Sequence, residues 1–108
     1  MDVDPLAPRL RRLPTTSVLG REARVAAGFR ARLLGLAFLG CGEAGPGLLI
    51  PRCSSVHTFG MRFPLDLFFL DESGAPVVIR RRVPARRLVS ARNAASVLEV
   101  PSAGGGEF

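Results

Sequence analysis

The chain has 108 residues, the size of one domain with a single modest hydrophobic core. A hydrophobic fraction of 47% argues against intrinsic disorder, and no apolar run is long enough to span a bilayer. The net charge is +6 and all 15 basic residues are arginine, which permits attraction to polyanions, but the sequence contains no recognised nucleic-acid motif. Two cysteines, Cys41 and Cys53, are too few for a disulfide scaffold and are expected to be reduced thiols.

The first 16 residues contain three prolines, so we expect residues 1–16 to form a flexible arm. The start of the chain lacks the basic residues and the apolar run of a signal peptide, and we therefore expect a cytoplasmic protein. A single domain is expected over residues 17–101, followed by a flexible tail over 102–108.

The domain is expected to begin with a strand and a helix. Residues 17–27 indicate a strand because they include β-branched valines, although their alanines would suit a helix equally well. Residues 28–38 indicate a helix, since five large apolar side chains recur there at helical spacing. Gly35 lies inside this helix, where glycine costs about 1 kcal/mol relative to alanine, so we expect another backbone to pack closely against it.

Short strands are expected along the rest of the chain, at residues 48–50, 55–59, 65–70, 77–83 and 97–100. The strand at 65–70 is almost wholly apolar, as is typical of a strand covered on both faces, whereas 77–83 should begin buried and end exposed. Turn residues at 71–74 and 60–64 link three of these strands into a β-meander. The predicted fold is α+β and mainly antiparallel β: a small twisted or barrel-like sheet with one N-terminal helix.

The stretch from Cys53 to Asp71 holds most of the side chains with chemistry, including the only histidine, His57. Four residues of extended chain would separate Cys53 and His57 by about 13 Å, so only a turn could form a nucleophilic thiol–imidazole pair. The alternative is a buried thiol and a histidine that hydrogen-bonds the backbone. The cysteine and histidine spacing fits no standard zinc pattern, and we expect no metal and no other cofactor.

A carboxylate at the head of the most apolar strand, Asp66, is the other unusual feature. Burial of its charge is unfavourable unless it is paired, and we expect Arg62, Arg52 or the N–H groups of residues 60–63 as partners. Asp66 would then brace that turn, or else orient His57 or bind a cationic or hydroxylated ligand. Glu99 poses the same question at the other end of the domain.

These arguments define a candidate pocket, with Phe59 and Met61 as walls that share the strand parity of His57. Its members are Cys53, His57, Phe59, Met61, Arg62, Asp66 and Glu99.

Residues 80–92 carry six arginines and no acid. The candidate anion-binding residues are Arg80, Arg82, Arg86 and Arg87. The simpler interpretation of the run is a solvated edge strand whose charge prevents aggregation, and the alternative is an anion-binding or nucleic-acid surface. The absence of interleaved aromatic residues does not favour nucleic acid as a partner.

Several blocks of this sequence resemble the domain-of-unknown-function 192 family. They are Arg32-Leu33-Leu34-Gly35-Leu36, Gly47-Leu48-Leu49-Ile50, Cys53 with Val56-His57-Thr58-Phe59-Gly60-Met61-Arg62-Phe63-Pro64-Leu65-Asp66, and Val97-Leu98-Glu99-Val100-Pro101. The resemblance covers about residues 17–104 and is closest to the short, cytosolic-type members. It implies a compact, mostly antiparallel β domain with an N-terminal helix, and it implies no known activity.

Three functions are consistent with the sequence. The first is a non-enzymatic binding or accessory module for a small ligand or protein, with a pocket near His57, Met61 and Asp66. The second is a hydrolase or transferase that uses Cys53 with His57. The third is polyanion binding through residues 80–92.

Overall fold

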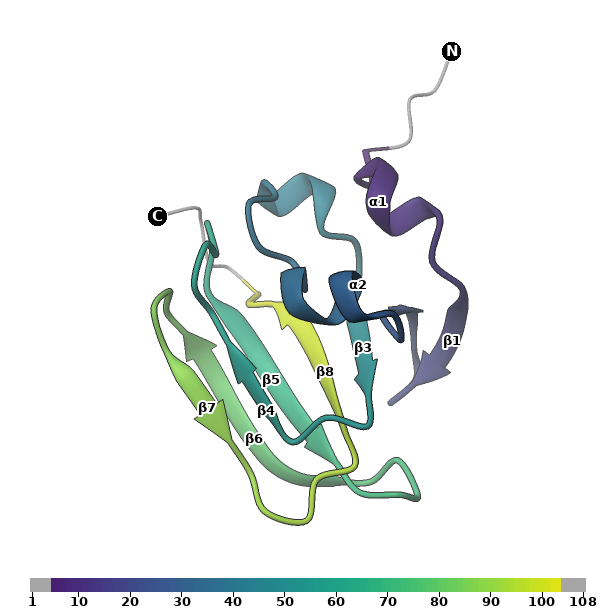
Figure 1. Ribbon diagram of the computed structural model, residues 1–108, viewed down its shortest axis with the longest axis vertical. Coiled ribbons are helices and arrows are strands. Elements are labelled where there is room, and N and C mark those ends of the chain that lie inside the picture. The colour runs from purple at the N-terminus through teal and green to yellow at the C-terminus, as the bar shows by residue number, and fades with distance from the viewer. Residues whose placement is uncertain (1–4, 104–108) are drawn as a thin grey trace.

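The computed structural model describes residues 5–103, and the strands of this part form a six-stranded and a two-stranded sheet. The larger sheet has the order β1-β2-β3-β8-β5-β6 and the smaller one pairs β4 with β7 (Figure 1). In chain order the strands are β1 (Thr15–Val18), β2 (Arg21–Val25), β3 (Leu48–Pro51), β4 (Ser55–His57), β5 (Leu65–Leu70), β6 (Pro76–Val83), β7 (Leu88–Ser90) and β8 (Ser96–Pro101). The helical segments are α1 (Pro8–Arg11), α2 (Phe29–Leu34) and the 3₁₀ turn η1 (Cys41–Glu43).

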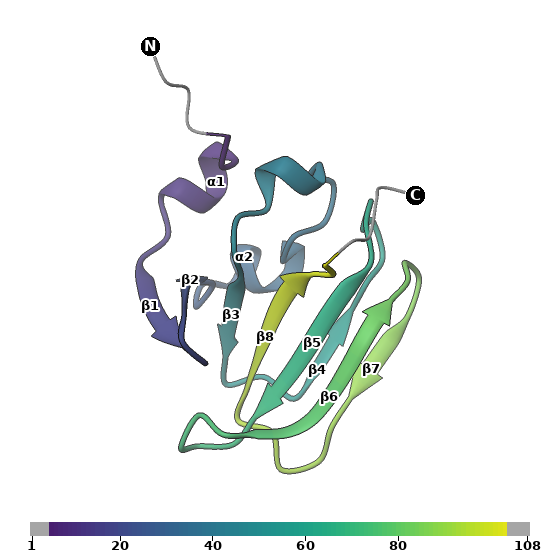
Figure 2. The same ribbon diagram turned by 180° about the vertical axis from the view of Figure 1, so that it is seen from behind.

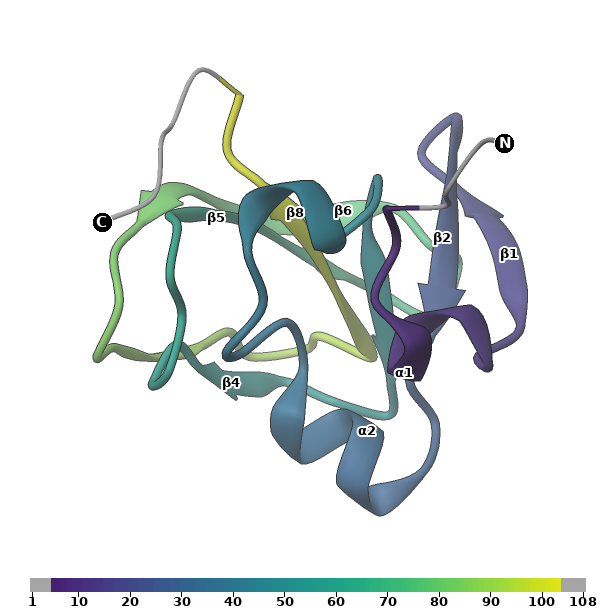
Figure 3. The same cartoon turned by 90° about the horizontal axis from the view of Figure 1, so that it is seen from above.

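The molecule has two layers. Figure 3 shows β5, β8 and β6 on one side, with β4 and α2 on the other. The larger sheet is antiparallel except for the β2–β3 pair, and β1 and β6 lie at its two edges. The mainly antiparallel prediction is therefore confirmed, but the sheet is not closed into a barrel. None of the described helices is long and apolar enough to cross a membrane.

Strand β5 is buried along its whole length, as the sequence predicts. Its alternate side chains enter two different clusters, because successive residues of a strand point to opposite faces. Leu65, Leu67 and Phe69 belong to the main core between the layers. Phe68 and Leu70 join a smaller cluster on the outer face, which Figure 2 presents to the viewer.

The predicted β-meander is only partly correct. The β5–β6 hairpin exists, with Asp71 Oδ1 accepting hydrogen bonds from the turn N–H groups of Ser73 and Ala75. Strand β4, however, pairs with β7 in the other layer and not with β5. Thr58, just after β4, holds the β6–β7 connection in place: its buried hydroxyl donates to the Pro84 carbonyl and accepts from the N–H of Arg87. Strand β7 was not predicted, since it is short and lies within the arginine-rich run.

Strand β6 also differs from its predicted burial. Val77 and Ile79, expected at a buried start, are each 43% exposed, whereas Val83 at the end is buried. The reason is its place at the sheet edge, with β5 as a neighbour on one side and no described strand on the other.

The N-terminal third contains more turns than the sequence indicated. The single strand predicted over 17–27 is the β1–β2 hairpin, turned at Leu19 and Gly20 with φ of 50° and 75°. Helix α2 is shorter than the predicted 28–38 segment, because Gly35 caps it at φ 52° and ψ −129°.

Part of the expected flexible arm is ordered. Residues 8–11 form α1, its Leu10 side chain is buried in the main core, and the Ala7 N–H donates to the Glu43 carbonyl. Residues 1–4 of that arm and 104–108 of the expected tail lie outside the described residues.

Asp66 braces a different part of the chain from the one expected. Its Oδ1 accepts hydrogen bonds from the Arg82 N–H at 2.9 Å and the Ser102 hydroxyl at 2.8 Å, and its Oδ2 pairs with Arg81 at 3.1 Å. Arg82 has φ 55° at a register shift between β5 and β6, so the carboxylate stabilises a β-bulge. Neither Arg52 nor Arg62 bonds Asp66, and its parity places it on the outer face of the sheet.

We predict that Asp66→Ala lowers the free energy of unfolding by about 1–3 kcal/mol, because the buried Ser102 hydroxyl and the partly buried Arg82 N–H lose their acceptor. Urea denaturation measures this loss. Arg81→Met is the matched control: Arg81 is exposed, so removal of its ion pair should change stability by less than about 1 kcal/mol. Equal losses in the two variants would contradict the bracing role of the bulge contacts.

Candidate functional site

A cavity of about 290 Å³ lies between α2 and β4 on one side and β3 and β8 on the other. Its walls are mostly apolar, and its polar groups are few. The lining residues are Arg32, Leu33, Leu34, Gly35, Leu36, Ile50, Cys53, Ser55, Val56, His57, Met61 and Glu99.

Glu99 is the acidic group of this cavity. It shares the face of Val97, which points into the main core, and its side chain is only 2% exposed. Its Oε1 atom has no hydrogen-bond partner. Burial raises the pKa of Glu99 to about 7, while a hydrogen bond with the backbone of Leu36 acts in the opposite direction.

Gly35 makes the room that this carboxylate needs. A Cβ atom at position 35 would lie 2.8 Å from Glu99 Oε1, and the backbone there has a conformation that only glycine adopts readily. The group packed against Gly35 is therefore a side-chain carboxylate and not the backbone that the sequence suggested. Arg9 of α1 fixes the same turn by donating to the carbonyl oxygens of Gly35 and Ala37.

His57, which also lines the cavity, carries a second buried polar atom without a partner. Its Nε2 lies 3.0 Å from the Leu33 carbonyl oxygen, and because a carbonyl can only accept, Nε2 carries the proton. In the neutral ring Nδ1 is then an acceptor, and it is buried without a partner. The His57–Leu33 bond also joins β4 to α2 across one side of the cavity.

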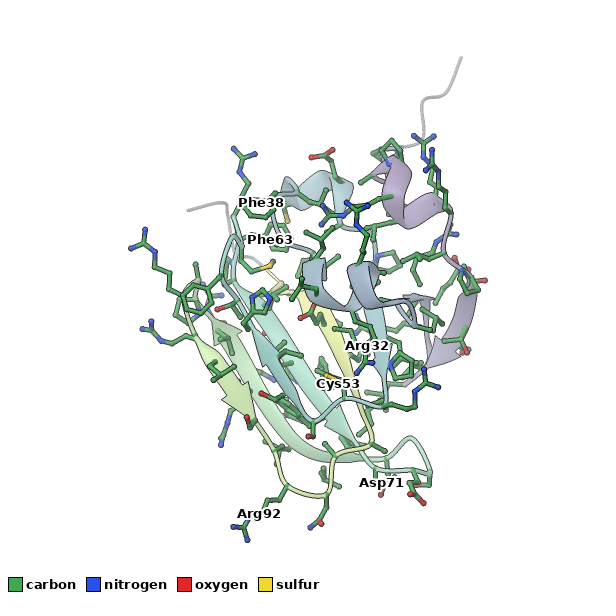
Figure 4. All side chains as sticks on the ribbon, in the orientation of Figure 1. Arg32, Phe38, Cys53, Phe63, Asp71 and Arg92 are labelled. Carbon is green, nitrogen blue, oxygen red and sulfur yellow. The ribbon has the colours of Figure 1, made fainter. Side chains whose placement is uncertain are left out.

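Cys53 lines the same cavity, but its thiol is engaged elsewhere. Its Sγ donates to the Ser55 carbonyl at 3.1 Å, and among the described residues no hydrogen bond joins Sγ to the His57 ring. Arg32 lies near Cys53 at the end of α2 (Figure 4), where it donates to the Arg52 carbonyl at 2.7 Å. The described residues contain no cluster of three or more His, Cys, Asp or Glu suited to a metal ion.

The candidate residues from the sequence thus divide into groups. Cys53, His57, Met61 and Glu99 line one cavity. Phe59 is exposed outside it, with its ring centroid 6.0 Å from that of His57.

The other two candidates lie apart from the cavity. Arg62 is exposed and does not line it, and Asp66 faces the opposite side of the sheet. Sequence reasoning missed Arg32 and Gly35 as cavity residues. Gly35, a glycine inside a predicted helix, was the available signal that this segment packs against another group.

The arginine-rich run lies on β6, β7 and the connections that follow them, and none of its residues lines this cavity. Arg80, Arg82, Arg86 and Arg87 are all exposed. Arg82 reaches the Ala103 carbonyl, while Arg81 is paired with Asp66 and lies 5.5 Å from the Phe68 ring centroid. The position of β6 at the sheet edge agrees with the simpler explanation, in which the arginine charges keep this edge strand from pairing with another chain.

Two layers of mainly antiparallel β structure, with a small cavity between them, define a compact β domain with short helical connections. The chain belongs to the DUF192 family, described as "Uncharacterized ACR", whose model matches residues 13–104. No curated protein matches the chain.

Two solved structures share this fold. One is a protein of unknown function from Novosphingobium aromaticivorans DSM 12444, with 18% identity, a TM-score of 0.61 and coverage of 86% of this chain and 79% of that one. The other is a protein of Sinorhizobium meliloti 1021 provisionally described as a transcription regulator, with 20% identity, a TM-score of 0.63 and coverage of 82% and 77%. At these identities the likeness concerns the fold alone.

We predict that Gly35→Ala lowers the free energy of unfolding by about 1–3 kcal/mol through backbone strain, with a further loss from its contact with Glu99. Gly28→Ala is the control, since Gly28 has an extended φ and open space around its Cα. Thermal and urea denaturation measure both variants. In the Gly35→Ala background, Glu99→Ala should recover the part of the lost stability that comes from the clash between residue 35 and Glu99. If the stability losses of the two single variants simply add in the double variant, the packing argument is contradicted.

We predict that the free energy of unfolding falls as pH rises from about 4.3 to about 7. Folding raises the pKa of Glu99, so the folded chain holds this proton more tightly than the unfolded chain does. The stability present below the unfolded pKa is lost as pH passes through the folded value, by an amount on the order of 3 kcal/mol.

Urea denaturation from pH 4 to 8 measures this loss, and Glu99→Gln should remove it. Parallel pH curves for the wild type and Glu99→Gln would contradict the assignment.

Proposed function

We propose that this domain is a non-enzymatic binding module for a small ligand with an apolar body and a polar head. The ligand would occupy the cavity between α2 and β4, with its head against Glu99 and His57. The observation that carries the proposal is the buried, unpartnered Oε1 of Glu99 at the wall of this cavity.

A buried polar atom without a partner is unfavourable by about 1–3 kcal/mol, and a group that satisfied it would recover part of that free energy. Nδ1 of His57 presents the same need at the same cavity. Oε1 accepts a hydrogen bond when Glu99 is ionised, and Nδ1 accepts one when the His57 ring is neutral. The complementary ligand head is therefore a hydrogen-bond donor.

The cavity suits a small ligand. Its volume of about 290 Å³ is at the lower end of the range for small-molecule sites. Leu34, Leu36, Ile50, Val56 and Met61 offer apolar contact to the body of the ligand. The pairing of apolar walls with a few placed polar groups is the usual composition of such sites.

Cys53–His57 catalysis is the competing function, because both residues line the cavity. It is less well supported, since each side chain bonds a backbone carbonyl and not the other. A nucleophilic pair would make Cys53 react with iodoacetamide well below the pH at which an ordinary thiol ionises. Labelling that begins only near pH 8.5 would count against this alternative.

We predict that a thermal-shift screen of small alcohols, amides and amines finds ligands that stabilise the wild type. Glu99→Gln should weaken their binding about tenfold, because the amide offers one acceptor and presents its own donors to the ligand head. Glu22→Gln makes the same chemical change at an exposed site on β2 and should leave binding unchanged. Ligands that stabilise both variants equally would contradict the site.

A further inference from the structure

The charges around the cavity are arranged by sign. Glu99 is the only acid among the described lining residues and is buried in the wall, and one arginine, the partly exposed Arg32, also lines the cavity. Arg32 lines the cavity and donates to the Arg52 carbonyl, which leaves other donors of its guanidinium unused. Arg52 and Arg62 are exposed and do not line the cavity, although Cys53 and Met61, their neighbours in the chain, do.

No described acid other than Glu99 lines this cavity. The remaining described acids lie on β2, in η1, on the outer face of the sheet and in the β5–β6 hairpin: Glu22, Glu43, Asp66, Asp71 and Glu72. Figure 4 shows Asp71 at the hairpin end of the molecule, apart from Arg32.

This arrangement opposes ligands that carry a single charge. An organic anion would meet Arg32 favourably but would place its charge near the Glu99 carboxylate, and a simple cation would have the reverse problem. A ligand with both charges satisfies both groups, with its cation inside and its anion outside.

We propose that the ligand of this cavity is a small zwitterion, an amino-carboxylate with an apolar body. Its ammonium group would bind Glu99 Oε1 and His57 Nδ1, and its carboxylate would bind Arg32. The inference rests on the proposed binding function and specifies the ligand class.

An ammonium group fits the inner site because it has three donors and no acceptor, and the two unpartnered atoms there are both acceptors. A carboxylate fits the outer site because a planar guanidinium presents parallel donors to two oxygens. The apolar walls between the two sites, which include Leu34 and Ile50, would contact the body of the ligand.

Isothermal titration calorimetry with two matched probe series tests the proposal. The first series is leucine, leucinamide and 4-methylpentanoate, and the second is 6-aminohexanoate, hexylamine and hexanoate. In at least one series the zwitterion should bind about tenfold more tightly than either analogue that lacks one of its charges.

Two variants should separate the two ends of the ligand. Glu99→Gln should weaken the zwitterion about tenfold but should not weaken the carboxylate analogue, because it removes a negative charge near that anion. Arg32→Gln should weaken the zwitterion and the carboxylate analogue alike but should not weaken the amine, because it removes a positive charge near that cation. Arg92→Gln, an exposed site in the β7–β8 connection, is the control and should change nothing.

Zwitterions that bind no more tightly than both analogues, or not at all, would overturn the proposal. If the thermal-shift screen still finds ligands that depend on Glu99, the binding module stands and only the ligand class fails. If no ligand depends on Glu99 in either experiment, both proposals fail.

Discussion

The burial of Glu99 beneath Gly35 is the constraint on which the site depends. A carboxylate on the central strand β8 is placed where a large part of its hydration is lost, and the turn above it has room only because residue 35 has no side chain. Arg9 of α1 and the His57–Leu33 hydrogen bond then hold the last turn of α2, and the turn that follows it, against the cavity. Four separate parts of the chain are therefore organised around one acidic group.

A comparison of the two buried carboxylates distinguishes scaffold from site. Asp66 and Glu99 lie on neighbouring strands of one sheet, on opposite faces. Asp66 has partners on both oxygens, all from the protein, and its role is complete without a ligand. Glu99 keeps one oxygen without a partner, and it borders a cavity. Since native proteins rarely leave such groups unsatisfied, the second arrangement supports the proposed ligand and the first does not.

Patterns local to the sequence were sufficient for much of the strand layout. The almost wholly apolar run at 65–70 predicted a doubly covered strand, and the family resemblance on the His57 to Asp66 block was confirmed. The errors arose where distant segments decide the structure. Nothing near β4 indicates that β7 is its partner, and the partners of Asp66 come from 15 to 36 residues further along the chain.

The candidate pocket shows the same limit. The parity of β8 fixes which face Glu99 occupies only once its neighbours in the sheet are known, and Gly35 is explained only when Glu99 is placed against it. Sequence reasoning identified unusual side chains but could not determine which of them share a face. Asp66 was grouped with His57 for this reason, although the sheet separates them.

The most direct test of the central claim is an NMR titration of the Glu99 side-chain carboxyl carbon in the folded protein. If Glu99 is buried in a cavity without a charged partner, its ¹³C shift should change with a midpoint near pH 7. Addition of a ligand whose head donates to Oε1 should lower that midpoint, because the ligand stabilises the ionised form. A midpoint near the ordinary glutamate value of about 4.3 in the free protein would show a solvated carboxylate and contradict the account.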